Sequence, residues 1–300
     1  MRSPLAGVAR SPSRRSVCTA AASVVLKALG YETETKVLSV PVTYTGLSQG
    51  DIDVFLGNWM PSMEADIAPY RDAGTVETVR ANLEGAKYTL ATNEHGAALG
   101  ISDFANIKDQ KDALGAQIYG IEPGNDGNRL VLEAINSPDF GMDGFELVES
   151  SEQGMLAEVA SKTEAGEPIV FLAWEPHPMN ANFKLTYLTG GDALFGPDFG
   201  GATIYTNTRK GYVAECPNTG ALLNNLVFSL AMENEIMGAI LNDGADPRDA
   251  AKAWLAANPD ARAVAFDCAY PEFGGVLTVE PRKVAPLSID GAQVAFRHDH

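Results

Sequence analysis

The sequence predicts an α/β protein with two lobes, each built on a sheet rich in parallel strands and flanked by helices. Short apolar or β-branched segments alternate with helical patterns along the chain, as in βαβ units. The 300 residues are enough for two lobes of ordinary size, each with its own core. Two stretches, residues 89–101 and 200–209, are interpreted as crossings between the lobes.

The first predicted element is an amphipathic helix over residues 21–29. Apolar side chains recur there at the spacing of one helix face, and Gly30 stands where the helix would end. Arg14, Arg15 and the following apolar stretch imitate an export signal, but Lys27 interrupts the stretch and no A-x-A cleavage site follows. We therefore interpret this segment as a helix packed on a sheet.

Strands and helices alternate after this first helix. The predicted strands cover residues 36–40, 53–57, 87–92, 117–121, 145–149, 169–174 and 185–188. Helices are predicted after the glycine-rich turn at 124–127, from a capping box at 150–153, over 222–228 and 232–241, and from 246–247. We expect residues 1–90 together with 208–300 to form the first lobe, residues 91–207 to form the second, and a ligand cleft to lie between them.

The charge balance restricts the possible partners. With 22 Lys and Arg against 39 Asp and Glu, the net charge is -17, which repels phosphate backbones and anionic lipid. We expect no nucleic-acid partner, and a cationic ligand fits the charge. The longest apolar runs, such as residues 169–174, are too short to span a bilayer, so we expect a soluble protein.

The cysteines and histidines do not suggest a metal site. Cys18, Cys216 and Cys268 lack the spacing of a metal-binding motif, so we expect no metal and no cofactor. We favour free thiols, with one disulfide as the alternative. His177 lies in a Trp-Glu-Pro-His-Pro string and is interpreted as structural.

Three polar or aromatic residues stand where a cleft should open. In open α/β sheets, ligands bind beyond the carboxyl ends of the strands. Trp59, Asn125 and Trp174 each follow or end a predicted strand, whereas Trp254 is assigned to the core. The electron-rich faces of two indoles attract a cation, and a quaternary ammonium suits them because it has no N–H to donate. For this pair of tryptophans, a binding role and a packing role remain equally open.

An enzyme is the less supported class. The loop at residues 122–129 resembles a phosphate cradle only superficially, since it has neither dinucleotide-binding nor P-loop spacing. Ser150 and Ser151 lie near Glu152, but no nucleophile elbow and no paired His activates either hydroxyl.

Several long strings resemble the periplasmic choline-binding proteins of ABC importers. They occur in family order at residues 38–44, 51–61, 85–92, 120–128 and 171–180. The resemblance extends from about Ala20 to Asp260. It implies a two-lobed periplasmic binding fold that closes on its ligand, a permease as partner, a periplasmic location, and a monomer without catalytic activity.

The resemblance also implies a choline site made as an aromatic box. Carried over by motif, Trp59, Tyr88 and Trp174 would supply walls, and Asn125 would orient the hydroxyl end of choline. Tyr88 is assigned by resemblance alone.

The amino-terminal region departs from the family pattern. The family has a strand leading into Gly-Trp-Thr-Asp, but Pro12 and Arg14 hold the places of that Trp and Asp, and residues 1–17 show no credible strand pattern. The resemblance also stops near Asp260. We expect a shifted reading frame or a wrong start at the ends, and weaker choline binding than in a complete family member.

Three alternatives stay open. Glycine betaine is the second candidate ligand, and its carboxylate would need several hydrogen-bond donors near the box. A folded relative that cannot bind is another possibility. From a different class, an enzyme acting on a phosphate or an amine would show turnover or a bound metal.

Overall fold

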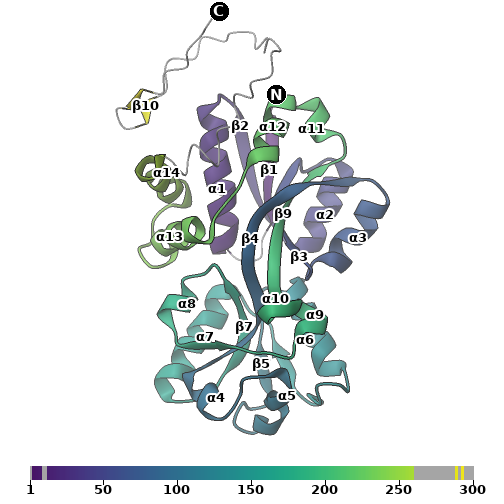
Figure 1. Cartoon of the computed structure of the whole chain (residues 1–300), viewed down its shortest axis with the longest axis vertical. Coiled ribbons are helices and arrows are strands. Elements are labelled where there is room, and N and C mark those ends of the chain that lie inside the picture. Colours follow the sequence, from purple (N-terminus) through teal and green to yellow (C-terminus); the bar gives the residue numbers. More distant parts are fainter. Residues whose placement is uncertain (1, 9–11, 260–287, 290–291, 294–300) are drawn as a thin grey trace, which may run out of the picture.

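The computed structural model describes residues 2–8, 12–259, 288–289 and 292–293. Its centre is a curled, mixed nine-stranded sheet with the order β2-β1-β3-β9-β4-β7-β5-β6, and β8 pairs with β4 beside this path. Helices flank the sheet (Figure 1). The predicted α/β class with two lobes is therefore confirmed.

The strands of the sheet are β1 (Arg2–Val8), β2 (Glu32–Leu38), β3 (Val54–Met60), β4 (Val76–Asn93), β5 (Gln117–Tyr119), β6 (Glu146–Val148), β7 (Val170–Glu175), β8 (Leu185–Tyr187) and β9 (Gly201–Arg209). Two further strands, β10 (Ser288–Ile289) and β11 (Ala292–Gln293), pair only with each other.

The longer helices are α1 (Pro12–Ala28), α2 (Val40–Gln49), α3 (Glu64–Asp72), α6 (Asp126–Asn136), α7 (Glu152–Ala165), α12 (Pro217–Asn225), α13 (Leu230–Leu241) and α14 (Pro247–Ala257). The short ones are α4 (Glu94–Ala98), α5 (Phe104–Ile107), η1 (Lys108–Gln110), α8 (Met179–Asn182), α9 (Asp192–Phe195), α10 (Pro197–Gly200) and α11 (Tyr212–Glu215). Among the described residues, no helix combines the length and apolarity needed to cross a bilayer.

The two lobes are joined by β4 and β9. In Figure 1 the upper, first lobe holds β1–β3, α1–α3 and α11–α14, and the lower, second lobe holds β5, β7 and α4–α9. Within the nine-stranded sheet, every antiparallel pairing involves β4 or β9, and the other pairings are parallel. The first crossing is β4, a strand of 18 residues that ends at Asn93, and not residues 89–101; the second is β9, which coincides with the predicted crossing at 200–209. The predicted residue boundaries of the lobes stay a prediction.

The bend in β4 has a local cause. The register between β4 and β9 shifts three times between Thr78 and Ala86, and Gly85 adopts φ +77, which only glycine adopts without strain. The buried Asn82 amide donates to the carbonyl of Leu56 at 3.1 Å and thereby ties the bent strand to β3. Because its pairing with β9 is irregular, β4 can bend and run through both lobes.

The amino-terminal region corrects one sequence expectation. Residues 2–8 form β1, paired in parallel with β2 over all seven residues and with β3 at Leu5 and Ala6. Pro4 and Gly7 are unusual inside a strand, so the sequence carries no strand pattern here. The backbones of the flanking strands, rather than side-chain periodicity, define this element.

Two smaller details of the helices also differ from expectation. The helix predicted over residues 21–29 is α1, which already begins at Pro12. The cap of α7 is Ser151 and not Ser150, because the Ser151 hydroxyl accepts the N–H of Gly154 at 3.0 Å.

Cys216 and Cys18 are not joined by a disulfide, and Cys268 lies outside the described residues.

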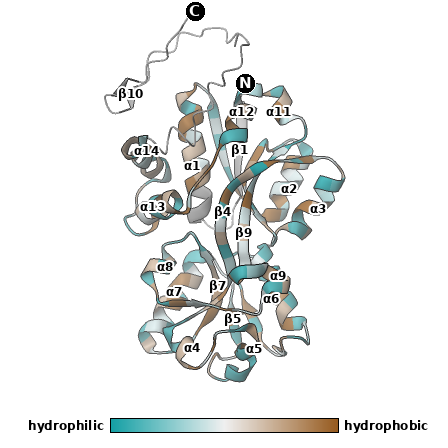
Figure 2. Ribbon diagram, in the orientation of Figure 1, coloured by the Kyte–Doolittle hydropathy of each residue, from teal (hydrophilic) through white to brown (hydrophobic). Residues whose placement is uncertain are grey.

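Each lobe has an apolar interior. In the first lobe, Tyr44, Leu47 and Phe55 are buried between α2 and the sheet. In the second, Phe171 of β7 lies opposite Ala91 of β4 and Tyr119 of β5, and it is fully buried. Figure 2 shows hydrophobic residues gathered on α1 and around β5 and β7.

Replacing Phe171 with Ala should destabilise the protein by about 3–5 kcal/mol, because the substitution opens a cavity in the second lobe. Chemical denaturation measures this change. Leu132→Ala is the control, since Leu132 is exposed on α6 and its loss should change the free energy of unfolding by less than about 0.5 kcal/mol. Equal effects of the two substitutions would contradict the assignment of Phe171 to the core.

Candidate functional site

Three aromatic residues from three strands meet where the lobes join. Trp59 lies near the end of β3, Tyr88 lies in β4, and Trp174 lies near the end of β7. Tyr88 and Trp174 are direct cross-strand partners. All three side chains are buried, with at most 4% exposed. The two tryptophans belong to the last residues of their strands, as their spacing in the sequence suggested.

The rings pack edge to face around Tyr88. Its ring centroid lies 6.1 Å from that of Trp59 and 6.2 Å from that of Trp174, with interplanar angles of 67° and 66°. Phe195 of α9 adds a fourth ring, 5.8 Å from Tyr88. We call Trp59, Tyr88, Trp174 and Phe195 the aromatic cluster. Edge-to-face packing leaves part of the ring faces directed away from the neighbouring rings.

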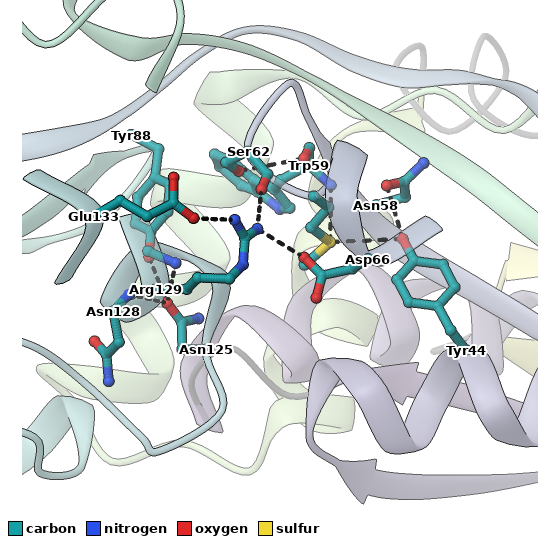
Figure 3. Close-up of polar contacts among 12 residues, drawn as sticks. Tyr44, Asn58, Trp59, Ser62, Asp66, Tyr88, Asn125, Asn128, Arg129 and Glu133 are labelled. Atoms are coloured by element: carbon teal, nitrogen blue, oxygen red, sulfur yellow. Dashed lines mark hydrogen bonds and ion pairs between the residues drawn. The ribbon is translucent and has the colours of Figure 1, made fainter. Parts of the chain in front are cut away.

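Asn125 connects this cluster to a helix start. It is the N-cap of α6, and its Oδ1 accepts the N–H of Gly127 at 2.7 Å and that of Asn128 at 3.3 Å. The Tyr88 hydroxyl donates to the same oxygen at 2.7 Å (Figure 3). The buried Nδ2 of Asn125 has no hydrogen-bond partner among the described residues. Asn125 therefore holds Tyr88 with its oxygen and offers a donor with its nitrogen.

Two glycines permit the position of Tyr88. A Cβ on Gly127, in the first turn of α6, would lie 1.8 Å from the Tyr88 hydroxyl oxygen. A Cβ on Gly200 would lie 1.9 Å from the Tyr88 carbonyl oxygen, and Gly200 also has φ +67. Both contacts are too close for any side chain, so Tyr88 can occupy this place only because these residues are glycine.

The backbone at Trp59 is fixed from its own lobe. The Trp59 N–H donates to the Sδ atom of Met63 at 3.4 Å, and the Ser62 hydroxyl donates to the Trp59 carbonyl at 3.3 Å. On the preceding residue, the side-chain oxygen of Asn58 accepts from the Tyr44 hydroxyl at 2.8 Å (Figure 3). Trp59 is thus held by the segment that links β3 to α3.

A pocket of about 190 Å³ lies next to Asn125. One wall comes from the first lobe, at the end of β2 and the start of α2, and the other comes from the loop that leads into α6. Its lining consists of Val37, Leu38, Ser39, Val40, Glu122, Pro123, Gly124 and Asn125. Glu122 is the ionisable residue among these lining residues, and its Oε1 accepts the backbone N–H of Glu152 at 3.4 Å.

A buried pair of His177 and Glu152 lies next to Trp174. The His177 ring lies 5.0 Å from that of Trp174, and the N–H of Met179 donates to His177 Nδ1 at 3.0 Å. Because Nδ1 accepts this bond, Nε2 carries the ring proton and donates it to Glu152 Oε1 at 3.0 Å. Both ring nitrogens are occupied by hydrogen bonds within the fold, in agreement with the structural role expected for His177.

The structure places all four sequence-predicted residues together, since Trp59, Asn125 and Trp174 each contact Tyr88. Sequence reasoning missed Phe195, because its segment shows no strand end or motif that would have marked it. It also missed the role of Gly127, which was interpreted as part of a turn. Trp254 is half-buried on α14 and donates to Glu235 at 2.5 Å, so it packs at the margin of the core.

The positions that depart from the family pattern lie at the start of α1. Pro12 is the first residue of this helix and Arg14 follows in its first turn. β1 ends at Val8 opposite Leu38, a lining residue of the pocket. The described residues contain no cluster of three or more His, Cys, Asp or Glu side chains that could hold a metal ion.

Comparison with known proteins gives a consistent result. The family described as the substrate binding domain of ABC-type glycine betaine transport systems matches residues 12–257. An ABC-transporter choline binding protein solved in complex with choline is 64% identical, with a TM-score of 0.84 over 86% of this chain and 90% of that chain. A choline binding protein in an unliganded semi-closed conformation is 61% identical, with a TM-score of 0.81 over 91% of this chain and 95% of that chain.

A further relative is more distant. The glycine betaine/carnitine transport binding protein GbuC of Listeria monocytogenes is 30% identical over 153 residues. That match covers 51% of this chain and spans only half, 50%, of the GbuC protein. The family match covers most of the chain and includes every residue of the aromatic cluster. The chain therefore belongs to the family of substrate-binding domains of ABC-type glycine betaine transport systems.

Proposed function

We propose that this chain captures choline between its two lobes and delivers it to the permease of an ABC importer. The observation that carries the proposal is the convergence of Trp59, Tyr88 and Trp174 at the junction of the lobes. A quaternary ammonium cannot donate hydrogen bonds, and buried ring faces attract it by up to about 2 kcal/mol or more per ring. The free Nδ2 donor of Asn125 suits the oxygen of the choline hydroxyl.

Choline is favoured over glycine betaine by the charges around the site. A betaine carboxylate needs several donors, whereas the residues that line the pocket beside Asn125 include the acidic Glu122 and no Lys, Arg or His. The guanidinium of Arg129 lies close by, but it is occupied by Asp66 and Glu133. The 64% identical protein solved with choline also supports this choice.

The proposal includes a partner, a location and the absence of catalysis. The family consists of extracytoplasmic binding proteins of transport systems, and we infer a periplasmic location and a permease partner for this chain. His177, which with Glu152 is the pair most similar to a catalytic dyad, bonds to Glu152 with one ring nitrogen and accepts the N–H of Met179 of α8 with the other. That arrangement supports a binding role.

Replacing Trp174 with Leu should weaken choline binding by about 2 kcal/mol, or roughly 30-fold, because an apolar side chain without a π face replaces the ring. Isothermal titration calorimetry with choline and with glycine betaine tests both this effect and the choice of ligand. Trp254→Leu is the control, since it removes a tryptophan from α14, away from the cluster.

Unchanged choline affinity in the Trp174→Leu variant, with the fold intact by circular dichroism, would remove Trp174 from the site. If the unmodified chain binds betaine more tightly than choline, the ligand assignment is wrong. If it binds neither, it is a binding-defective relative.

Replacing Arg14 with Asp should strengthen choline binding by roughly tenfold. The family resemblance implies an acidic residue at this position, and exchanging a positive for a negative charge there favours a cationic ligand. Arg15→Asp is the matched control because it makes the same change of charge one residue away. Titration should show a clearly larger gain for Arg14→Asp. Equal gains would mean that only the net charge matters, and the assignment of position 14 would be wrong.

A further inference from the structure

Arg129 connects the two lobes beside the aromatic cluster. It lies on α6, one helical turn after Asn125, and its Nη2 donates to the carbonyl of Ser62 at 3.0 Å and to Oδ2 of Asp66 at 3.1 Å. Its Nη1 donates to Glu133 on the same helix at 3.0 Å. Asp66 of α3 and the nearby Ser62 belong to the first lobe, whereas Arg129 of α6 belongs to the second (Figure 1), and Figure 3 shows the bonds between them.

These bonds join the walls of the proposed site. Ser62 also holds the carbonyl of Trp59, so Arg129 contacts the segment that positions one wall. Asn125, which caps the helix that carries Arg129, holds Tyr88. The guanidinium therefore links the Trp59 side of the cluster to the Asn125 side without being part of the cluster.

The environment of this ion pair makes it stronger than an ordinary surface pair. The side chain of Arg129 is 35% exposed and that of Asp66 is 16% exposed, so solvent screens the pair only in part. Glu133 neutralises and orients the guanidinium from within the second lobe. Two carboxylates against one guanidinium also leave no excess positive charge beside a cationic ligand.

We propose that Arg129 is a latch that holds the lobes closed. The bonds to Ser62 and Asp66 form only when α3 and α6 are close, so their free energy favours the closed state and is lost when the lobes part. The latch acts on the rate of ligand release through closure and not through contact with the ligand. The effect of the latch on choline release rests on the proposed function. Its effect on lobe closure can be measured without any ligand.

Arg129→Ala should raise the dissociation rate of choline by about tenfold, as expected for a partly buried, charge-assisted contact between lobes. The dissociation constant should rise less than this rate, because the ligand-free variant is also more open and captures choline at least as fast. Stopped-flow tryptophan fluorescence measures both rate constants. Arg71→Ala is the matched control, since Arg71 makes a two-bond pair with Glu64 within α3 and crosses no interface.

Substituting Asp66, the carboxylate that Arg129 binds across the lobes, gives an independent test. Asp66→Asn should also speed release, and the Arg129→Ala/Asp66→Asn double variant should release choline no faster than Arg129→Ala alone, because both changes break the same contact. Independent, multiplying effects in this cycle would contradict the latch. A drop in thermal stability with an unchanged release rate would show a purely structural role and would also overturn it.

Small-angle scattering of the ligand-free proteins separates the latch from the choice of ligand. Arg129→Ala should have a larger radius of gyration than the unmodified chain, whereas Arg71→Ala should not. If the unmodified chain fails to bind choline, the proposed function is wrong, and the scattering comparison still decides the latch. An identical radius of gyration for Arg129→Ala and the unmodified chain would overturn it.

Discussion

The site depends on one constraint, the passage of β4 through both lobes. This strand pairs with β9 on one side and with β7 and β8 on the other, so its backbone position is fixed along most of its length. Tyr88 lies on it and contacts Trp59 of the first lobe and Trp174 and Asn125 of the second. Trp59, Trp174 and Asn125 are therefore arranged around a ring that the sheet holds in place.

The charges around the aromatic cluster also suit a cationic ligand. A buried cation needs negative partners or π faces, since a desolvated charge without them is costly. Glu122 lines the adjacent pocket, the Glu152–His177 pair lies behind Trp174, and the positive charge of Arg129 is offset by Asp66 and Glu133. The acidic chain as a whole, with a net charge of -17, favours the approach of a cation.

Three of the four candidate site residues could be predicted from the sequence alone, because they stand at or just after the ends of predicted strands. Trp59, Trp174 and Asn125 stand at the ends of apolar strands or just after them, and the parallel strands of an α/β lobe direct these ends to one edge. Tyr88 lies inside a long strand, so only the family resemblance identified it. β1 was missed because Pro4 and Gly7 remove its strand pattern, while the backbones of β2 and β3 still define it.

Other features arise from contacts distant in sequence. Phe195 contacts Tyr88 across more than a hundred residues of sequence, and Gly127 of α6 is required by the Tyr88 hydroxyl of β4. Arg129 is an ordinary exposed helical arginine by pattern, and only the approach of α3 shows that it joins the lobes. Hydrophobic periodicity reports on burial within an element and contains no information about such pairings.

The central claim is that the site recognises positive charge through ring faces, and not merely a bulky apolar group. It is tested most directly by comparing choline with 3,3-dimethylbutan-1-ol, which has the same shape but a neutral carbon in place of the nitrogen. Titration calorimetry should show choline binding at least about 30-fold more tightly, a difference of about 2 kcal/mol, and the difference should shrink in the Trp174→Leu variant. Equal affinities for the two compounds would contradict the account.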